Sequence, residues 1–335
     1  MKPYFLTLFV VLSLMSCSST STQSEATATL QWDTVSGVST GTLLRLDSSH
    51  TKGTLSARPL DIWLPSTYDG KRKHAVLYMY DGQMLFDANS TWNHQEWRVD
   101  EIMDSLIVTK TTLPTIIVAL HHGGVTRNFE YFPQKPFKTL RAQFSDSTMA
   151  EIASRYGSDT AFPIKSDAYL HYMVDIVKPL VDTTFQVYSD KSATAVAGSS
   201  MGGLMSMYAI GEYPEVFGTA LCMSTHWPGG FSPNEEIPNA FQAYIAHNIT
   251  PERINRIYFD YGTETLDAMY EPFQNQVNSV LESNGFVSGE RWVTQKFPGA
   301  AHDLVNAVSQ RQRSAVCASV WPSSSHRAPH PGTFG

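Results

Sequence analysis

The sequence is poor in charged residues, and this shortage excludes several classes of protein. Asp, Glu, Lys and Arg make up only 16% of its 335 residues, whereas 42% are hydrophobic. Soluble domains usually carry roughly 25% charged residues, and disordered chains or coiled coils need more. With 24 Lys and Arg against 31 Asp and Glu, the net charge is -7 and no basic stripe is present. The composition therefore predicts a folded protein that does not bind nucleic acid through phosphate neutralisation.

Long hydrophobic runs are lacking too, although a short one stands near the N-terminus. Lys2 precedes the apolar run 4–12, which is shorter than the about 20 residues of a membrane-spanning helix. Leu14-Met15-Ser16-Cys17 follows, and the whole is typical of a bacterial signal peptide over residues 1–17. The ending resembles the lipobox of bacterial lipoproteins, which implies lipidation of Cys17 and a lipid anchor in the cell envelope, at the periplasm or outer membrane. The alternative is an ordinary signal peptide with an incidental cysteine.

The rest of the chain is predicted to form one domain between two polar segments. Residues 18–29 are all Ser, Thr, Ala, Gln or Glu, a composition that favours a flexible tether. Residues 311–335 contain few apolar residues and much Pro, Ser, His and Arg, which indicates a disordered or divergent tail. The interval 30–310 is long enough for a single α/β domain.

Apolar runs of strand length alternate with stretches of helical spacing along this interval. Strands are expected at 59–64, 74–80, 115–120, 192–197, 219–223, 256–261 and 292–297, and helices after an N-cap at Ser166, at 201–210 and at 272–281. Strands that are apolar on both sides are typical of parallel sheets covered by helices on both faces. The predicted fold class is therefore α/β, with a mostly parallel, doubly wound sheet. Cys222 lies in one of the expected strands and is predicted to be a buried free thiol.

The strongest motif is Gly198-Ser199-Ser200-Met201-Gly202, between an expected strand and an expected helix. A serine nucleophile is presented at such a sharp strand-to-helix turn, and glycines two residues away on either side relieve crowding there. The motif predicts Ser200 as nucleophile, with the amide of Met201 at a helix N-terminus as an oxyanion donor. The alternative is a glycine-rich turn without chemistry.

A serine nucleophile needs a base and an acid, which the chain order Ser, acid, His places further along. His302 follows the strand 292–297 and is the candidate base. The acid should follow the strand 256–261, where Asp267 is favoured over Glu264. The second oxyanion donor should come from the turn after the strand 74–80, where Gly82 permits close approach and the Gln83 amide faces the substrate.

Five segments resemble the putative esterase family of α/β-hydrolases, which groups enterochelin esterase, feruloyl esterases, esterase D and mycolyltransferases. The matching segments are Asp81-Gly82-Gln83-Met84-Leu85-Phe86-Asp87, Arg127–Pro133, Gly198–Gly203, Asp260–Glu264 and Gly299–Asp303. The resemblance implies the α/β-hydrolase fold, Ser200 as nucleophile, His302 as base, an acid at or near Asp267, oxyanion amides at Gln83 and Met201, and no metal or other cofactor. After Asp303 relatives continue with an amphipathic helix, and its loss here would weaken the packing of His302.

Further polar and aromatic residues are candidates for substrate binding. Trp92 is expected at the rim of the site, and His226 with Trp227 follows a strand where an aromatic ring suits stacking on a sugar or phenol, or else core packing. Arg127 is predicted to form a structural ion pair with Glu130, the alternative being recognition of a substrate carboxylate.

The sequence as a whole predicts a serine esterase that acts on a small-molecule or carbohydrate ester. A feruloyl or acetyl ester of a polysaccharide and a siderophore ester are the expected substrates. An acyltransferase to a sugar acceptor and a catalytically impaired glycan-binding lipoprotein are the alternatives.

Overall fold

A computed structural model describes residues 30–48, 51, 55–142, 146, 154, 163–230 and 234–302. The sheet and helices described below belong to the unit that begins at Gln31. The expected signal peptide with Cys17, the tether at 18–29 and the tail at 311–335 lie outside the described residues.

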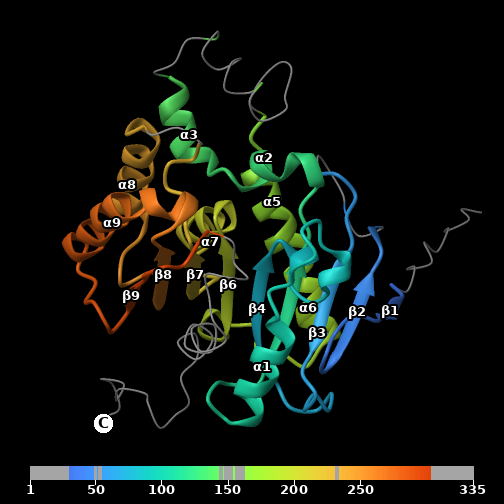
Figure 1. The fold of residues 1–335 in the computed structure, drawn as a ribbon. Coiled ribbons are helices and arrows are strands. Elements are labelled where there is room, and N and C mark those ends of the chain that lie inside the picture. The colour runs from blue at the N-terminus through green and yellow to red at the C-terminus, as the bar shows by residue number, and fades with distance from the viewer. Residues whose placement is uncertain are drawn as a thin grey trace, which may run out of the picture. The chain divides into compact units, whose positions relative to one another are not determined.

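The described residues contribute nine strands to one mixed sheet (Figure 1). The strands are β1 (Trp32–Val35), β2 (Thr42–Leu46), β3 (Leu60–Leu64), β4 (Ala75–Tyr80), β5 (Thr115–Leu120), β6 (Thr194–Ser199), β7 (Thr219–Met223), β8 (Arg256–Gly262) and β9 (Trp292–Phe297). Their order across the sheet is β1-β2-β3-β5-β4-β6-β7-β8-β9. The pairs from β1 to β5 are antiparallel, and those from β5 through β4 to β9 are parallel. The carboxyl ends of the parallel strands therefore share one edge, where chemistry in such sheets is placed.

Helices connect the parallel strands and cover the sheet. The longer helical elements are α1 (Val99–Val108), α2 (Arg127–Tyr131), α3 (Gln134–Arg141), α5 (Ser166–His171), the π-helical segment η5 (Tyr172–Val177), α6 (Lys178–Thr184), α7 (Met201–Glu212), α8 (Glu236–Asn248) and α9 (Glu271–Ser283). Short 3₁₀ turns lie at η2 (Gly82–Met84), η3 (Ala88–Ser90), η4 (Gly124–Thr126), η6 (Lys191–Ala193) and η7 (Thr265–Met269).

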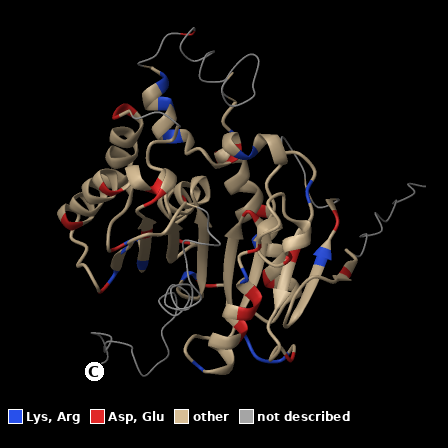
Figure 2. Cartoon of the chain, in the orientation of Figure 1, with Lys and Arg blue, Asp and Glu red and all other residues tan. Residues whose placement is uncertain are grey.

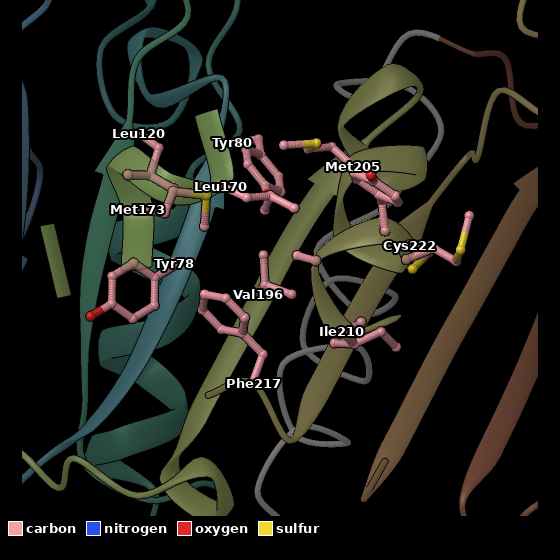
Figure 3. Close-up of a cluster of buried hydrophobic side chains, with 14 of the residues drawn as sticks. Tyr78, Tyr80, Leu120, Leu170, Met173, Val196, Met205, Ile210, Phe217 and Cys222 are labelled. Atoms are coloured by element: carbon pink, nitrogen blue, oxygen red, sulfur yellow. The ribbon is translucent and has the colours of Figure 1, made fainter. Parts of the chain in front are cut away.

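Two apolar layers form because successive side chains of a strand point to opposite faces of the sheet. On one face, Tyr78 and Tyr80 of β4 join residues of α5, α7, α8 and α9. Figure 3 shows this layer, in which Val196 and Cys222 from the strands belong to the same cluster as Met205 and Ile210 of α7. On the other face, Leu77 and Met79 of the same β4 join α1. Burial on both faces explains the uninterrupted apolar runs of the central strands.

The predicted fold class is confirmed, and the bounds of β5, β7 and β9 match their expected ranges. Cys222 is buried and free, as expected. Ser166 does not cap a helix; it is the first residue of α5 and makes no cap hydrogen bond. The antiparallel strands β1 and β2 were not predicted, because their side chains are mostly half-exposed and give no apolar run.

The charged side chains of the described elements are dispersed. Figure 2 shows Lys and Arg interspersed with Asp and Glu, with a small basic group on α3 at Lys135, Lys138 and Arg141. No helix within the described residues is both long and apolar enough to cross a membrane.

Candidate active site

Ser200 occupies the sharp turn between β6 and α7, in strained backbone geometry. β6 ends at Ser199 and α7 begins at Met201, while Ser200 between them has φ 58° and ψ -117°. An ordinary L-residue rarely adopts this conformation, and such strain is concentrated at functional sites. The N–H of Ser200 donates to the carbonyl of Met223 at the end of β7, which helps to hold the turn.

The glycines around the turn differ in how much room they have. A Cβ on Gly198 would lie 2.6 Å from the carbonyl oxygen of Gly202, and one on Gly203 would lie 2.9 Å from Thr225 Oγ1. A Cβ on Gly202 would meet nothing closer than 3.4 Å. The expected crowding therefore applies to Gly198 but not to Gly202, and Gly203 is the second crowded position.

A hydrogen-bonded chain joins Ser200, His302 and Asp267. His302 Nε2 lies 3.0 Å from Ser200 Oγ, and His302 Nδ1 lies 2.5 Å from Asp267 Oδ1. The acid side chain is fully buried, whereas the imidazole is 21% exposed. This arrangement has the geometry in which an imidazole takes the proton of a serine hydroxyl while a carboxylate fixes its tautomer.

The carboxylate of Asp267 is held by two further donors. Its Oδ2 accepts hydrogen bonds from the N–H of Gly262 at 2.6 Å and from Ser224 Oγ at 2.8 Å. Glu264, the other candidate acid, is exposed and lies at the start of η7 without a side-chain cap bond. The structure thus brings Asp267, and not Glu264, to His302.

The loop that carries His302 is fastened to the loop that carries Asp267. The carbonyl of Ala300 accepts from the amides of Thr263 and Glu264, and the amide of His302 donates to Thr265 Oγ1 at 2.8 Å. A Cβ on Gly262 would lie 2.1 Å from the carbonyl oxygen of Ala300, so the two loops touch backbone to backbone. These contacts within the described residues help to position His302.

The two expected oxyanion donors stand at the starts of helices. Met201 is the first residue of α7, and Gln83 is the second residue of η2. Amides in the first turn of a helix have no intrahelical partner, so they remain available to an oxyanion. Gly82 permits a close backbone approach, as expected, and the neighbour is β5: a Cβ there would lie 2.7 Å from the backbone of Ala119.

A cavity of about 250 Å³ opens beside Ser200 and His302. Its described lining consists of Asp81, Met84, Trp92, Asn93, Trp97, His122, Arg127, Ser199, Ser200 and His302. Trp92 lies at the rim, where 84% of its surface is exposed. The cavity lining therefore combines apolar and aromatic side chains with polar and charged ones.

Arg127 does not pair with Glu130, contrary to the sequence-based expectation. Its Nε and Nη2 donate to Asp81 Oδ1 and Oδ2 at 2.6 and 2.8 Å. Burial by itself lowers the pKa of Arg127, but the charge and hydrogen bonds of Asp81 raise it above its ordinary value. Glu130 instead pairs with Arg58 at 2.7 and 2.9 Å, with both side chains 1% exposed. Sequence distance is misleading for this pair, because Arg58 precedes Glu130 by 72 residues.

His226 and Trp227 are buried behind the site and do not line the described part of the cavity. Trp227 is 1% exposed, packs against Phe259 and donates to Gln274 through Nε1. This packing corresponds to the core alternative and leaves no ring face for a sugar. His226 Nδ1 lies 2.7 Å from the hydroxyl of Tyr270. Burial and the neighbouring His302 lower the pKa of His226 to about 3, so it is neutral near pH 7.

Sequence reasoning did not identify the roles of three residues of the site. Asp81 stands there only as part of a turn motif, although its carboxylate holds Arg127. Ser224 and Tyr270 belong to no motif, although Ser224 holds Asp267 and the ring of Tyr270 packs edge-on against His302. Within the part of the chain that the structure describes, no cluster of His, Cys, Asp or Glu has the composition of a metal site.

Comparison with known proteins agrees with the α/β-hydrolase class that the fold and this site define. Residues 52–282 match the family described as "Putative esterase", so the chain belongs to that family. A Bacillus subtilis (strain 168) relative, described as "Uncharacterized protein YbbA", is 26% identical over 266 residues, which are 75% of this chain and 90% of the relative.

Solved structures share the fold at low sequence identity. The enterobactin esterase FES from Shigella flexneri is 17% identical with a TM-score of 0.55; the match covers 83% of this chain but 58% of that enzyme's length. An IroE-like serine hydrolase from Shewanella oneidensis is 14% identical with a TM-score of 0.58, over 87% of this chain and 80% of its own. The CE1 ferulic acid esterase AmCE1/Fae1A from Anaeromyces mucronatus is 19% identical with a TM-score of 0.53, over 87% and 100%.

Proposed function

We propose that this protein is a serine esterase that hydrolyses a carboxylic ester through an acyl-enzyme on Ser200. The observation that carries the proposal is the chain of hydrogen bonds from Ser200 Oγ through His302 to the buried carboxylate of Asp267. Membership of the esterase family supports the same reaction class.

In the proposed reaction, Ser200 Oγ attacks the ester carbonyl carbon and passes its proton to His302 Nε2. The amides of Met201 and Gln83 donate to the developing oxyanion. The bond from the carbonyl carbon to the alcohol oxygen breaks, and His302 returns the proton to the departing alcohol. Water then attacks the acyl-enzyme with His302 as base, which releases the acid and restores Ser200.

Substrates with one apolar or aromatic portion suit the proposal. The cavity of about 250 Å³ is smaller than the roughly 300–1,000 Å³ of clefts for drug-sized ligands, so it accommodates one part of an ester. The solved neighbours include enzymes named for enterobactin and for ferulic acid. We therefore propose a siderophore ester, or a feruloyl or acetyl ester of a carbohydrate, as the substrate.

Labelling with a fluorophosphonate, followed by peptide mapping, tests the proposal directly. The folded protein should form an adduct on Ser200, release p-nitrophenol in a burst from short-chain esters, and lose both properties in Ser200→Ala. Ser199→Ala is the matched control, since Ser199 is the adjacent serine and lies at the end of β6. A folded protein that carries no adduct on Ser200 would refute the proposal.

We also propose that the mature protein is anchored in the bacterial cell envelope through a lipid on Cys17. The support is the sequence Leu14-Met15-Ser16-Cys17 after a short apolar run. Mass spectrometry of the mature N-terminus should find a diacylated cysteine, and Cys17→Ser should move the protein from the membrane fraction to the soluble fraction.

A further inference from the structure

The lining of the cavity includes an ion pair between Asp81 and Arg127, and the nucleophile Ser200 lines the same cavity. We propose that Asp81 is a specificity-determining residue that neutralises Arg127, so that the site selects uncharged esters over esters bearing a carboxylate. The inference rests on the proposed esterase function and assigns the charge class of its substrate.

Arg127 and Asp81 form a two-pronged ion pair, and both residues line the same cavity as Ser200. Arg127 donates to both carboxylate oxygens of Asp81, whose side chain is 4% exposed against 26% for Arg127. A Cβ on Gly202, two residues after the nucleophile, would lie 3.4 Å from Asp81 Oδ2. A substrate carboxylate that approached Arg127 would therefore meet the charge of Asp81 as well. The remaining Nη1 edge of Arg127 suits a neutral acceptor such as a carbonyl, hydroxyl or phenol oxygen.

The anchoring of Asp81 makes displacement by a substrate anion unfavourable. Its backbone is in the left-handed region at φ 58°, and its N–H donates to the hydroxyl of Tyr131 at 3.1 Å. The guanidinium of Arg127 lies over the ring of that same Tyr131, 5.1 Å from its centroid. Both charged partners are therefore fixed by one buried tyrosine, and neither is a flexible surface group.

Neighbouring charges do not restore a net positive potential. His122 Nε2 lies 3.8 Å from Asp81 Oδ1, but burial lowers the pKa of His122, which leaves it neutral at pH 7. Glu130, three residues after Arg127, is itself neutralised by Arg58. The lining also includes the apolar side chains of Met84, Trp97 and the exposed Trp92. The chemistry fits an uncharged ester that carries an aromatic or apolar group.

Two pairs of synthetic esters test this selectivity, with the charge placed on either side of the ester bond. On the acyl side, the mono-4-nitrophenyl ester of adipic acid is compared with the same ester whose distal carboxyl is methylated. On the alcohol side, 4-acetoxybenzoate is compared with its methyl ester. The measured quantity is the ratio of kcat/KM for the neutral and the anionic member. Effects of a mutation on catalysis common to both members cancel in this ratio.

Two single variants and one double variant of Asp81 and Arg127 form a double-mutant cycle. Asp81→Asn leaves the cation uncompensated and should shift at least one ratio by about tenfold or more toward the anionic member, because charges a few ångströms apart interact strongly at a partly buried site. Arg127→Gln should shift the same ratio toward the neutral member. The double variant is neutral again and should return to about the wild-type ratio. Asp33→Asn, at an exposed position on β1, is the control for a change in net charge.

Several results would overturn the inference. Wild-type protein that prefers the carboxylate in either pair refutes it without any mutation, so the test survives a variant that fails to fold. Ratios that stay within about twofold in both single variants also refute it. Wild-type protein that turns over none of the four esters and takes no fluorophosphonate refutes the proposed esterase function, whereas turnover with unchanged ratios refutes the selectivity alone.

Discussion

Replacing Asp267 with Asn should abolish most of the activity by reversing the tautomer of His302. Oδ2 of the carboxylate receives two donors, the N–H of Gly262 and the hydroxyl of Ser224. In the variant the amide oxygen takes that position, because an NH₂ group there would face two donors. The NH₂ group is then directed at His302 Nδ1, which must accept. His302 Nε2 would consequently carry the proton and could no longer take one from Ser200.

The size of the loss follows from the charge that Asp267 places beside the imidazolium. With charge centres about 4 Å apart and an effective dielectric constant near 20, the attraction is about 4 kcal/mol. Each 1.4 kcal/mol changes a rate tenfold, so kcat/KM should fall by roughly 10³. The carboxylate is fully buried, so solvent screens this attraction little.

The assay compares Asp267→Asn with Glu264→Gln in hydrolysis of 4-nitrophenyl butyrate and in the rate of fluorophosphonate labelling. Glu264 lies in the same loop but is exposed, so its variant should keep activity within about twofold of wild type. Thermal melting checks that both variants fold. Retention of more than a tenth of the activity in Asp267→Asn, or an equal loss in Glu264→Gln, would refute the assignment of the acid.

Three further changes test the packing that supports the site. Glu130→Gln should lower the free energy of unfolding by about 3–5 kcal/mol, measured by urea denaturation, because the buried charge of Arg58 would lose its carboxylate partner. Gly198→Ala should lower the melting temperature strongly, since its Cβ would lie 2.6 Å from the Gly202 carbonyl, whereas Gly202→Ala should cost little stability. Asp260→Asn should gain stability relative to wild type as pH rises from about 4 to 7, because burial raises the pKa of Asp260 to about 7.

The sign of the last prediction follows from proton binding. Between pH 4 and 7 an unfolded chain has lost the Asp260 proton while the folded protein keeps it, so rising pH favours unfolding of the wild type. Asparagine does not titrate, so a stability difference that stays flat with pH would contradict the burial argument. Equal melting temperatures for Gly198→Ala and Gly202→Ala would contradict the crowding argument. An unchanged urea midpoint in Glu130→Gln would mean that the pair adds no net stability.

Much of the fold was predictable because local composition determines it. The central strands are buried on both faces, so β5 and β7 appear in the sequence as apolar runs with the bounds that they have in the structure. β9 has its expected bounds too, although it ends the described sheet and most of its residues are half-buried. β1 and β2 could not be found in this way, because half-exposed side chains on an antiparallel edge leave only a weak pattern. The N-cap expected at Ser166 is a different kind of miss, because Ser166 is the first residue of α5 and its side chain is buried there.

The sequence by itself determined where the turn at Ser200 lies, because a glycine motif between an apolar strand and an apolar helix is a local signal. Tertiary structure decided which groups meet that turn: His302 lies 102 residues after Ser200, and Asp267 lies 35 residues before His302. It also decided that Asp267, and not Glu264, contacts His302 and that Arg127 pairs with Asp81. Trp227 is buried in the core for the same reason. The physical reason is that hydrogen bonds and ion pairs act over about 3 Å in space. Separation along the chain says nothing about that distance until the sheet has brought its strand ends together.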